Sequence, residues 1–258
     1  GETTKPIQFQ RIDSLEQINS NAKKLYSNRQ SILPKEKWNK IGIVEMTAMM
    51  MNEGTKNYSN EKIEAELDRL GSNINFLGNR GGTSINVTCL KKNLDPTLKL
   101  LEECLLNPGF KSEDFKIVKK RYRSSTKQAD KEPNSVAGKI YSYAIYGGDN
   151  ILGLSPTVKT IENIELADLA DYYDKYYSPS QCNLIVVGDL EENEILPKLD
   201  FLNKWRKRDF AIPIPSDPPP VKEPKFYIAN KELASSSVII MGYPSLKFDV
   251  AGDYYKNR

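Results

Sequence analysis

The chemistry open to this chain is limited first by a residue type that is missing. Its 258 residues include no histidine, which excludes a histidine-liganded zinc ion and the Ser-His-Asp and Cys-His arrangements of nucleophilic catalysis. The cysteines lie far apart without a C-x-x-C spacing, at Cys89, Cys104 and Cys182. We expect them to be small buried apolar side chains rather than metal ligands or a set of disulfides.

The segment with the clearest pattern is Gly42–Thr55. Its apolar residues recur at steps of three and four, at Ile41, Val44, Ala48 and Met51. This spacing predicts an amphipathic helix with one buried stripe, which ends at Gly54.

The same segment resembles the signature helix of the insulinase/pitrilysin-type (M16) zinc peptidases, with a Gly at its start, a Met-rich turn and a Gly-Thr pair at its end. The resemblance implies the position of a His-x-x-Glu-His motif, in which two His side chains bind zinc and the Glu activates water. In this chain Glu45 and Met49 stand at the His positions and Ala48 at the Glu position. The third zinc ligand of active relatives, a Glu, falls in the same register on Ser125.

These four vestigial positions, Glu45, Ala48, Met49 and Ser125, lead to two expectations. None of the four side chains can do the work of its counterpart, so the resemblance implies a chain with no catalytic residue and no bound metal. We also expect Ala48 and Met49 to pack as ordinary apolar side chains against a helix at 112–130.

Further motifs extend the resemblance over residues 38–258. The run Asn93–Phe110, with its Asn-Leu-Asp start and Leu-Asn-Pro-Gly-Phe end, and the run Asn183–Asp189 are similar to segments of the family. The resemblance implies an α+β fold, a LuxS/MPP-like metallohydrolase lobe with a largely antiparallel sheet and helices mainly on one face.

Residue patterns predict the strands and helices of this lobe. A Gly-rich turn at 78–82 joins two strand-like runs, 74–77 and 83–90, into a hairpin. The aliphatic residues at 184–187 fit a central strand buried on both faces. Further helices are expected at 59–71, within 93–110, and at 112–130, 136–147, 166–177 and 191–202.

The N-terminal residues fit the family less well. We expect an edge strand at Ile7–Gln10 and a helix from Asp13 or Ser14 to Leu25. Residues 1–36 lack the strand hairpin with which lobes of this type usually begin.

The composition divides the chain into three parts. Residues 1–205 are expected to form the first, inactive lobe, and the proline-rich residues 206–224 an extended linker. Residues 225–258 are expected to begin a second, similar lobe, with strands at 226–228 and 236–242.

Two groups of residues are candidates for contact with peptide or with a facing repeat. One is the basic side of the helix at 112–130, which contains Lys116, Lys119, Lys120 and Arg123. The other consists of Tyr141, Tyr143 and Tyr146. The alternatives are a solvated charged face for the first group, and core or rim packing for the second.

The resemblance implies that the chain is the catalytically inactive half of an M16-type zinc peptidase. It would shape a peptide-enclosing chamber and support substrate binding for an active repeat, fused or separate, that carries the zinc. The family's inactive halves supply an Arg and a Tyr from later in the second lobe, which are not assigned here. The alternative is a structural or assembly subunit with this fold and no role in proteolysis.

Other classes of function find little support. An independent enzyme would need a nucleophile and a base at a spacing that indicates a catalytic pair, and the sequence shows no such pair. A nucleic-acid binder would depend on the basic helix alone, because 37 Lys and Arg against 34 Asp and Glu leave a net charge of only +3. No apolar run approaches the roughly 20 residues of a membrane span.

The composition leaves the compartment open. Frequent Lys, Asn and Tyr, together with a first residue that is Gly rather than Met, are compatible with a trimmed periplasmic or cell-envelope protein of a bacterium. A eukaryotic organelle is the alternative.

Overall fold

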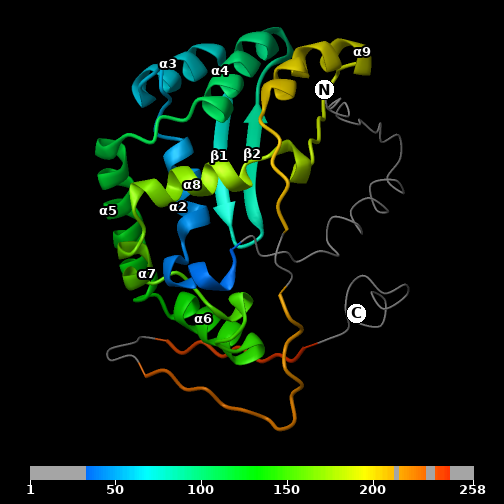
Figure 1. The fold of residues 1–258 in the computed structure, drawn as a ribbon. Helices are drawn as coiled ribbons and strands as arrows, with labels where there is room; N and C mark the ends of the chain where they lie inside the picture. Colours follow the sequence, from blue (N-terminus) through cyan, green and yellow to red (C-terminus); the bar gives the residue numbers. More distant parts are fainter. Residues whose placement is uncertain (1–32, 212–214, 231–235, 245–258) are drawn as a thin grey trace.

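The computed structural model describes residues 33–211, 215–230 and 236–244 (Figure 1). The expected strand at Ile7–Gln10 and the expected helix ending at Leu25 lie outside these residues. The described part is a helix-rich α+β fold with a two-stranded antiparallel sheet. The α+β prediction is therefore confirmed, with fewer strands than expected among the described residues.

The elements follow one another along the chain with short connections. The sheet consists of β1 (Asn73–Asn79) and β2 (Gly82–Thr88). The longer helices are α2 (Ile43–Met51), α3 (Asn60–Leu70), α4 (Leu94–Leu106), α5 (Ser112–Ala129), α6 (Pro133–Tyr146) and α8 (Leu166–Tyr176). Shorter helical turns are η1 (Lys35–Lys40), η2 (Lys91–Asn93), η3 (Ile151–Gly153), α7 (Val158–Glu162), η4 (Pro179–Gln181), α9 (Glu192–Ile195) and η5 (Leu196–Lys204).

The predicted hairpin is confirmed. β1 and β2 pair antiparallel, with Phe76 opposite Ile85 and Asn79 opposite Gly82. Phe76 is 2% exposed and packs into the core beneath α2. Asn52 links this helix to the hairpin, because its side-chain amide donates to the Phe76 carbonyl at 2.9 Å and its carbonyl oxygen accepts from the Phe76 N–H at 2.9 Å.

The backbones of β1 and α2 approach each other closely at Gly78. A Cβ at this position would lie 2.6 Å from the Glu45 Cα and 2.6 Å from the Val44 carbonyl oxygen. Only glycine allows the strand to cross the helix at this distance.

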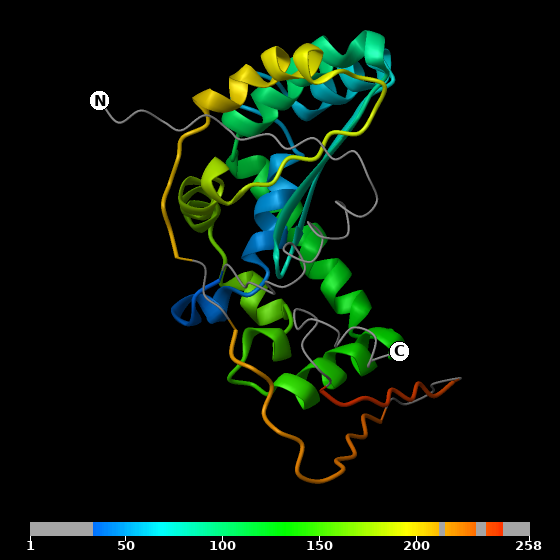
Figure 2. The ribbon, with the colours of Figure 1, turned by 90° about the vertical axis from the view of Figure 1, so that its right-hand side faces the viewer.

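Helix α2 is surrounded by the hairpin, α5 and α8, so apolar side chains on most of its circumference are buried (Figures 1 and 2). Met46 and Ala48 are 0% exposed, and Met50 is 1% exposed. The surrounding helices contribute Val118 from α5 and Leu169 from α8, both 0% exposed. A helix that is apolar on nearly all sides is typical of a core helix.

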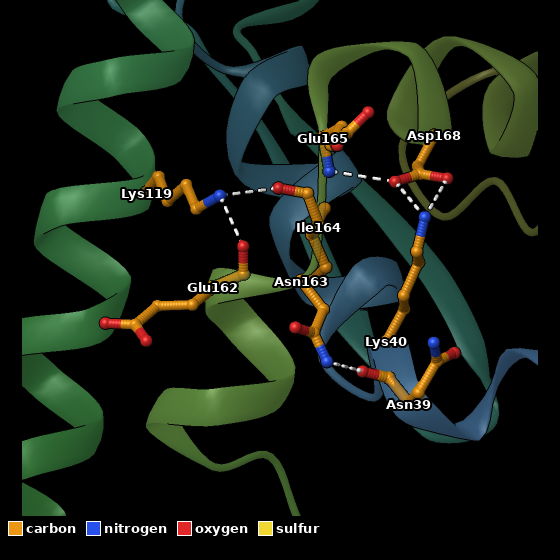
Figure 3. Close-up of polar contacts among 8 residues, drawn as sticks. All are labelled: Asn39, Lys40, Lys119, Glu162, Asn163, Ile164, Glu165 and Asp168. Atoms are coloured by element: carbon orange, nitrogen blue, oxygen red, sulfur yellow. Dashed lines mark hydrogen bonds and ion pairs between the residues drawn. The ribbon is translucent and has the colours of Figure 1, made fainter.

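Polar contacts join α5, α7, α8 and η1 around this core (Figure 3). The ammonium of Lys119 donates to the carbonyls of Glu162 and Ile164, at 2.9 and 2.6 Å, where α7 ends. The ammonium of Lys40 lies 2.6 Å from both carboxylate oxygens of Asp168. The same carboxylate accepts from the N–H of Glu165 at the start of α8.

The prediction of a central strand at 184–187 is wrong for the described structure. Residues 182–187 are extended without ladder pairing, and Ile185 and Val187 are 67% and 92% exposed. The segment runs beside β2, held at one end by the hydrogen bond between Thr83 and Tyr177 and at the other by the ion pair of Lys91 with Asp189. Side-chain contacts therefore place it near the sheet while its backbone stays unpaired.

The strands predicted at 226–228 and 236–242 are also absent from the described residues. Phe226, Ile228 and Met241 are 91%, 93% and 90% exposed, and no backbone ladder involves either segment. Their composition favours strands, but a strand needs a hydrogen-bonding neighbour, and none of the described residues supplies one.

Two smaller expectations are corrected as well. The helix predicted at 191–202 is a short α-helix followed by the 3-10 helix η5, because Pro197 removes a backbone donor near its middle. Among the cysteines, only Cys104 is buried, whereas Cys89 is half-buried and Cys182 is exposed.

We predict that the contact between Lys40 and Asp168 stabilises the fold. Burial alone would raise the pKa of Asp168, but the hydrogen bond from Lys40 and the one from the Glu165 N–H hold it below the usual 3.8. The two side chains are only 21% and 12% exposed, so the change Lys40→Met should cost about 2 kcal/mol at pH 7.

Because the lowered pKa belongs to the folded state, this contribution is present above the unfolded pKa and is lost as the pH falls through the folded pKa. Urea unfolding at pH 7 and pH 3 measures it, with Lys56→Met at an exposed site as the matched control. A loss at pH 7 no larger than that of the control would contradict the prediction.

Candidate functional site

The candidate site is the stretch of α2 that holds Glu45, Ala48 and Met49. The helix begins at Gly42, whose φ of 107° favours glycine. The ring of Tyr122 from α5 lies against this glycine, so that a Cβ there would come within 3.1 Å of the Tyr122 Cε1. The start of α2 is thus fixed between α5 and the hairpin.

Glu45 is a half-buried residue whose carboxyl group has a cationic neighbour, Arg80. Burial raises the pKa of Glu45, while the charge of Arg80 opposes the shift. The Arg80 guanidinium donates to the Leu152 carbonyl at 2.7 Å and to the Ser155 Oγ at 2.8 Å. Arg80 is held at the hairpin turn by neutral acceptors, so its charge remains available to Glu45.

Two tyrosines complete the surroundings of Glu45. Burial, and then the charge of Glu45, raises the pKa of Tyr122 on α5. Burial and the neighbours Tyr177, Tyr176 and Glu45 raise the pKa of Tyr172 on α8. Both phenols therefore stay protonated at neutral pH.

The Tyr172 hydroxyl has no hydrogen-bond partner within the described part of the chain. Its ring packs on Tyr176 with the centroids 4.7 Å apart and edge-on to Tyr177 at 6.5 Å. The side chain is therefore held by aromatic packing rather than by polar contacts.

The other vestigial positions are divided between the core and the surface. Ala48 is 0% exposed, and Met49 is half-buried and packs against the same core. Ala48 is thus an apolar core residue and Met49 a partly buried one, while the expected contact of these two side chains with α5 stays a prediction. Ser125 is exposed on α5, where its hydroxyl donates to the Tyr122 carbonyl at 2.9 Å.

The residues at these positions do not fit a zinc ion. Of the four, only Glu45 offers a strong zinc ligand, because a methyl group, a thioether and a neutral hydroxyl are poor ones. Arg80 also places a positive charge near that carboxylate. No group of three His, Cys, Asp or Glu side chains suited to a metal occurs among residues 33–211, 215–230 and 236–244.

The structure separates the basic residues of α5 into two groups. Lys119 binds the carbonyls at the end of α7 and lies over the Phe115 ring, and Arg121 pairs with Glu53. Lys116 and Lys120 are exposed, and Arg123 forms only a half-exposed ion pair with Glu162 at 3.4 Å. Lys119 is therefore a structural residue, whereas the other three predicted contact residues of α5 face outward.

The three predicted tyrosines lie on α6. Tyr143 is 51% exposed, and Tyr141 and Tyr146 are half-buried. Gly242 lies against the Tyr141 ring so closely that a Cβ would overlap it. Residues 236–244 pass beside α6 in Figures 1 and 2, in keeping with the contact of Gly242 with Tyr141. Within the described residues, no hydrogen bond or ring contact joins Tyr141 or Tyr143 to the lysines of α5.

Sequence reasoning missed two neighbours of Glu45. Arg80 lies in a turn that the sequence marks only as glycine-rich, and Tyr172 is one of several tyrosines at helical spacing. For Arg80, the available signal was a single arginine within a glycine-rich turn. For Tyr172, nothing in the local sequence pattern distinguishes it from the neighbouring tyrosines.

The fold and the altered α2 define a lobe of the zinc-peptidase type. Two family models match consecutive parts of the chain, "Insulinase (Peptidase family M16)" at residues 34–151 and "Peptidase M16 inactive domain" at residues 163–257. The chain belongs to the M16 peptidase family. No curated protein matches its sequence.

Solved structures share this fold at low identity. A peptidase M16 inactive domain from Pseudomonas fluorescens is 19% identical, with a TM-score of 0.64 over 74% of this chain and 48% of its own. A protease from Helicobacter pylori is 21% identical, with a TM-score of 0.59 over 70% of this chain and 45% of its own.

The periplasmic protease PqqL from Escherichia coli is also 21% identical, with a TM-score of 0.58 over 72% of this chain and 22% of its own. The chain thus spans about half the length of the first two structures, and less of PqqL. None of the described helices combines the length and hydropathy needed to cross a bilayer.

We predict that ionisation of Glu45 destabilises the fold. Because burial raises its pKa above 4.5, the folded chain holds the proton more tightly than the unfolded chain, and the free energy of unfolding falls as the pH rises through that window. The change Glu45→Gln removes this loss, so the stability of the variant relative to the original should increase from pH 4 to pH 7.

Urea unfolding at several pH values measures the difference, with Glu64→Gln on the exposed side of α3 as the matched control. A relative stability that stays constant or declines with pH would show that Glu45 is not in the desolvated environment described.

We also predict that zinc binding can be restored in the family's register. The combination Glu45→His, Met49→His and Ser125→Glu should bind one zinc ion, because it places three strong ligands on the packed helices α2 and α5. Ala48 is left unchanged because it is fully buried.

Zinc at about 100 times its Kd should add about 2.7 kcal/mol to the unfolding free energy of this variant. Met49→His alone serves as the control and should show no such gain. A triple variant that folds but does not bind zinc would mean that the register is wrong.

Proposed function

We propose that the chain is the catalytically inactive half of an M16-type zinc peptidase. The observation that carries the proposal is the loss of all four functional side chains in one ungapped register, at Glu45, Ala48, Met49 and Ser125. The region around Glu45 is packed as core, with Ala48 fully buried. A pseudo-peptidase of this kind has no hydrolytic activity of its own.

The partner in this proposal is an active repeat that carries the His-x-x-Glu-His motif and the zinc ion, in the same polypeptide or as a separate subunit. The match of residues 163–257 to the M16 inactive domain supports this role. The inactive half shapes the chamber that encloses a peptide and supports its binding.

The division of the chain belongs to the same proposal. Residues 1–205 form the inactive lobe, 206–224 the linker and 225–258 the start of a second lobe. The contacts of Arg208 with Ser178 and Asp174 support a fixed path for the linker where it leaves the first lobe. The hydrogen bond of Asn150 to Ser216 supports it further along. The exposed apolar side chains of Phe226, Ile228 and Met241 suit strands that pair in the complete lobe.

We further propose that the outward residues of α5 and the tyrosines of α6 contact peptide or the facing repeat. A periplasmic or cell-envelope location fits the similarity of the fold to PqqL, which is described as a periplasmic protease.

The experiment compares peptide cleavage by the active repeat alone and together with this chain in its complete polypeptide. We expect kcat/KM to rise at least about tenfold with the chain present, which corresponds to about 1.4 kcal/mol of transition-state stabilisation. An inert protein at the same concentration is the control, and the chain alone should cleave nothing.

Equal cleavage with and without the chain would contradict a role in the chamber. The outcome would instead favour a structural or assembly subunit with an M16 fold.

A further inference from the structure

The outward side of α5 carries a row of cations that the fold does not use. Lys116, Lys120, Arg123 and Lys127 are three or four residues apart, which places them on one side of the helix. We call these four residues the basic stripe. Val118 and Tyr122 mark the opposing side of α5, which is buried against α2. The stripe therefore lies on the side of α5 away from α2, and α5 itself lies at the left border of the fold in Figure 1.

Most of the stripe forms no ion pair within the described residues. Among the described residues, Lys116, Lys120 and Lys127 are exposed and take part in no hydrogen bond or ion pair. Arg123 has only its contact with Glu162, in which the two side chains are 48% and 50% exposed. Like charges at this spacing repel one another and weaken the helix. An anionic ligand would remove that repulsion.

We infer that the basic stripe binds acidic segments of the polypeptides that the proposed peptidase encloses. This inference rests on the proposed function and names the chemistry of its substrates. The stripe is about 16 Å long at 1.5 Å per residue, with successive charges about 4.5 to 6 Å apart. An extended peptide presents alternate side chains on one face about 6.6 Å apart. A segment of about six residues with carboxylates at alternate positions therefore spans the same length.

The surroundings of the stripe favour a peptide over the other polyanions. The affinity of a protein for duplex DNA rises with the number of phosphates that it neutralises, and four cations neutralise about four at most. A helix that lies on an anionic membrane needs a free apolar face, but that face of α5 is buried. Ile117 is 54% exposed next to the stripe and offers an apolar contact that a peptide side chain can use.

The test measures binding of a fluorescent nine-residue peptide of alternating Ser and Glu by anisotropy. The stripe variant K116E/K120E/K127E is compared with K56E/K92E/K99E, which makes the same change of charge at exposed lysines outside α5. We expect the stripe variant to weaken binding at least about tenfold, the combined effect of three exposed ion pairs. The control variant should bind within about twofold of the original, and the Gln version of the peptide should not bind.

A milder variant, K116Q/K120Q/K127Q, keeps the test valid if the charge reversal disturbs folding, and urea unfolding checks each variant. Equal losses in the stripe and control variants would overturn the inference, as would binding of duplex DNA or anionic vesicles as tight as that of the peptide. If the stripe binds the peptide but the partner repeat cleaves equally well without the chain, the proposed function is wrong, whereas the binding of acidic peptide by the stripe is supported. If cleavage needs the chain but the stripe variants bind the peptide normally, only the inference about the stripe is wrong.

Discussion

The burial of α2 on nearly all sides is the constraint on which the rest of this structure depends. Gly78 brings β1 into contact with the backbone of the helix, and Asn52 locks the two together through paired amide contacts. Helices α5 and α8 close the remaining sides with Val118 and Leu169. A helix packed in this way is positioned by apolar contacts and hydrogen bonds, so its geometry does not need a metal ion.

Packing of α2 also explains the unusual environment of Glu45, which stands where the M16 resemblance places a zinc ligand. A partly desolvated carboxyl group is costly when charged, and Arg80 at the hairpin turn only partly offsets that cost. The phenols of Tyr122 and Tyr172 fill the surroundings with aromatic surface rather than with metal ligands.

The sequence predicts those parts of the fold in which local pattern and packing agree. The periodicity of α2, α3 and α5 and the glycine-rich turn of the hairpin predict these elements correctly. The aliphatic run at 184–187 does not become a strand in the described structure, because strand formation depends on a backbone partner that the run itself cannot supply. The hydrogen bonds of Arg80 and Lys119 cannot be predicted from the local sequence either. Their acceptors lie more than 40 residues away in sequence, at Leu152, Glu162 and Ile164.

We expect α2 to keep its place in this M16 lobe without zinc. The most direct measurement is the metal content of the purified chain by mass spectrometry, together with its thermal unfolding in the presence of a chelator and of excess zinc. We expect less than about 0.1 zinc per chain and no change of the unfolding midpoint, because binding to the folded state alone would raise it. One tightly held zinc per chain, with a midpoint that falls on chelation, would contradict the account.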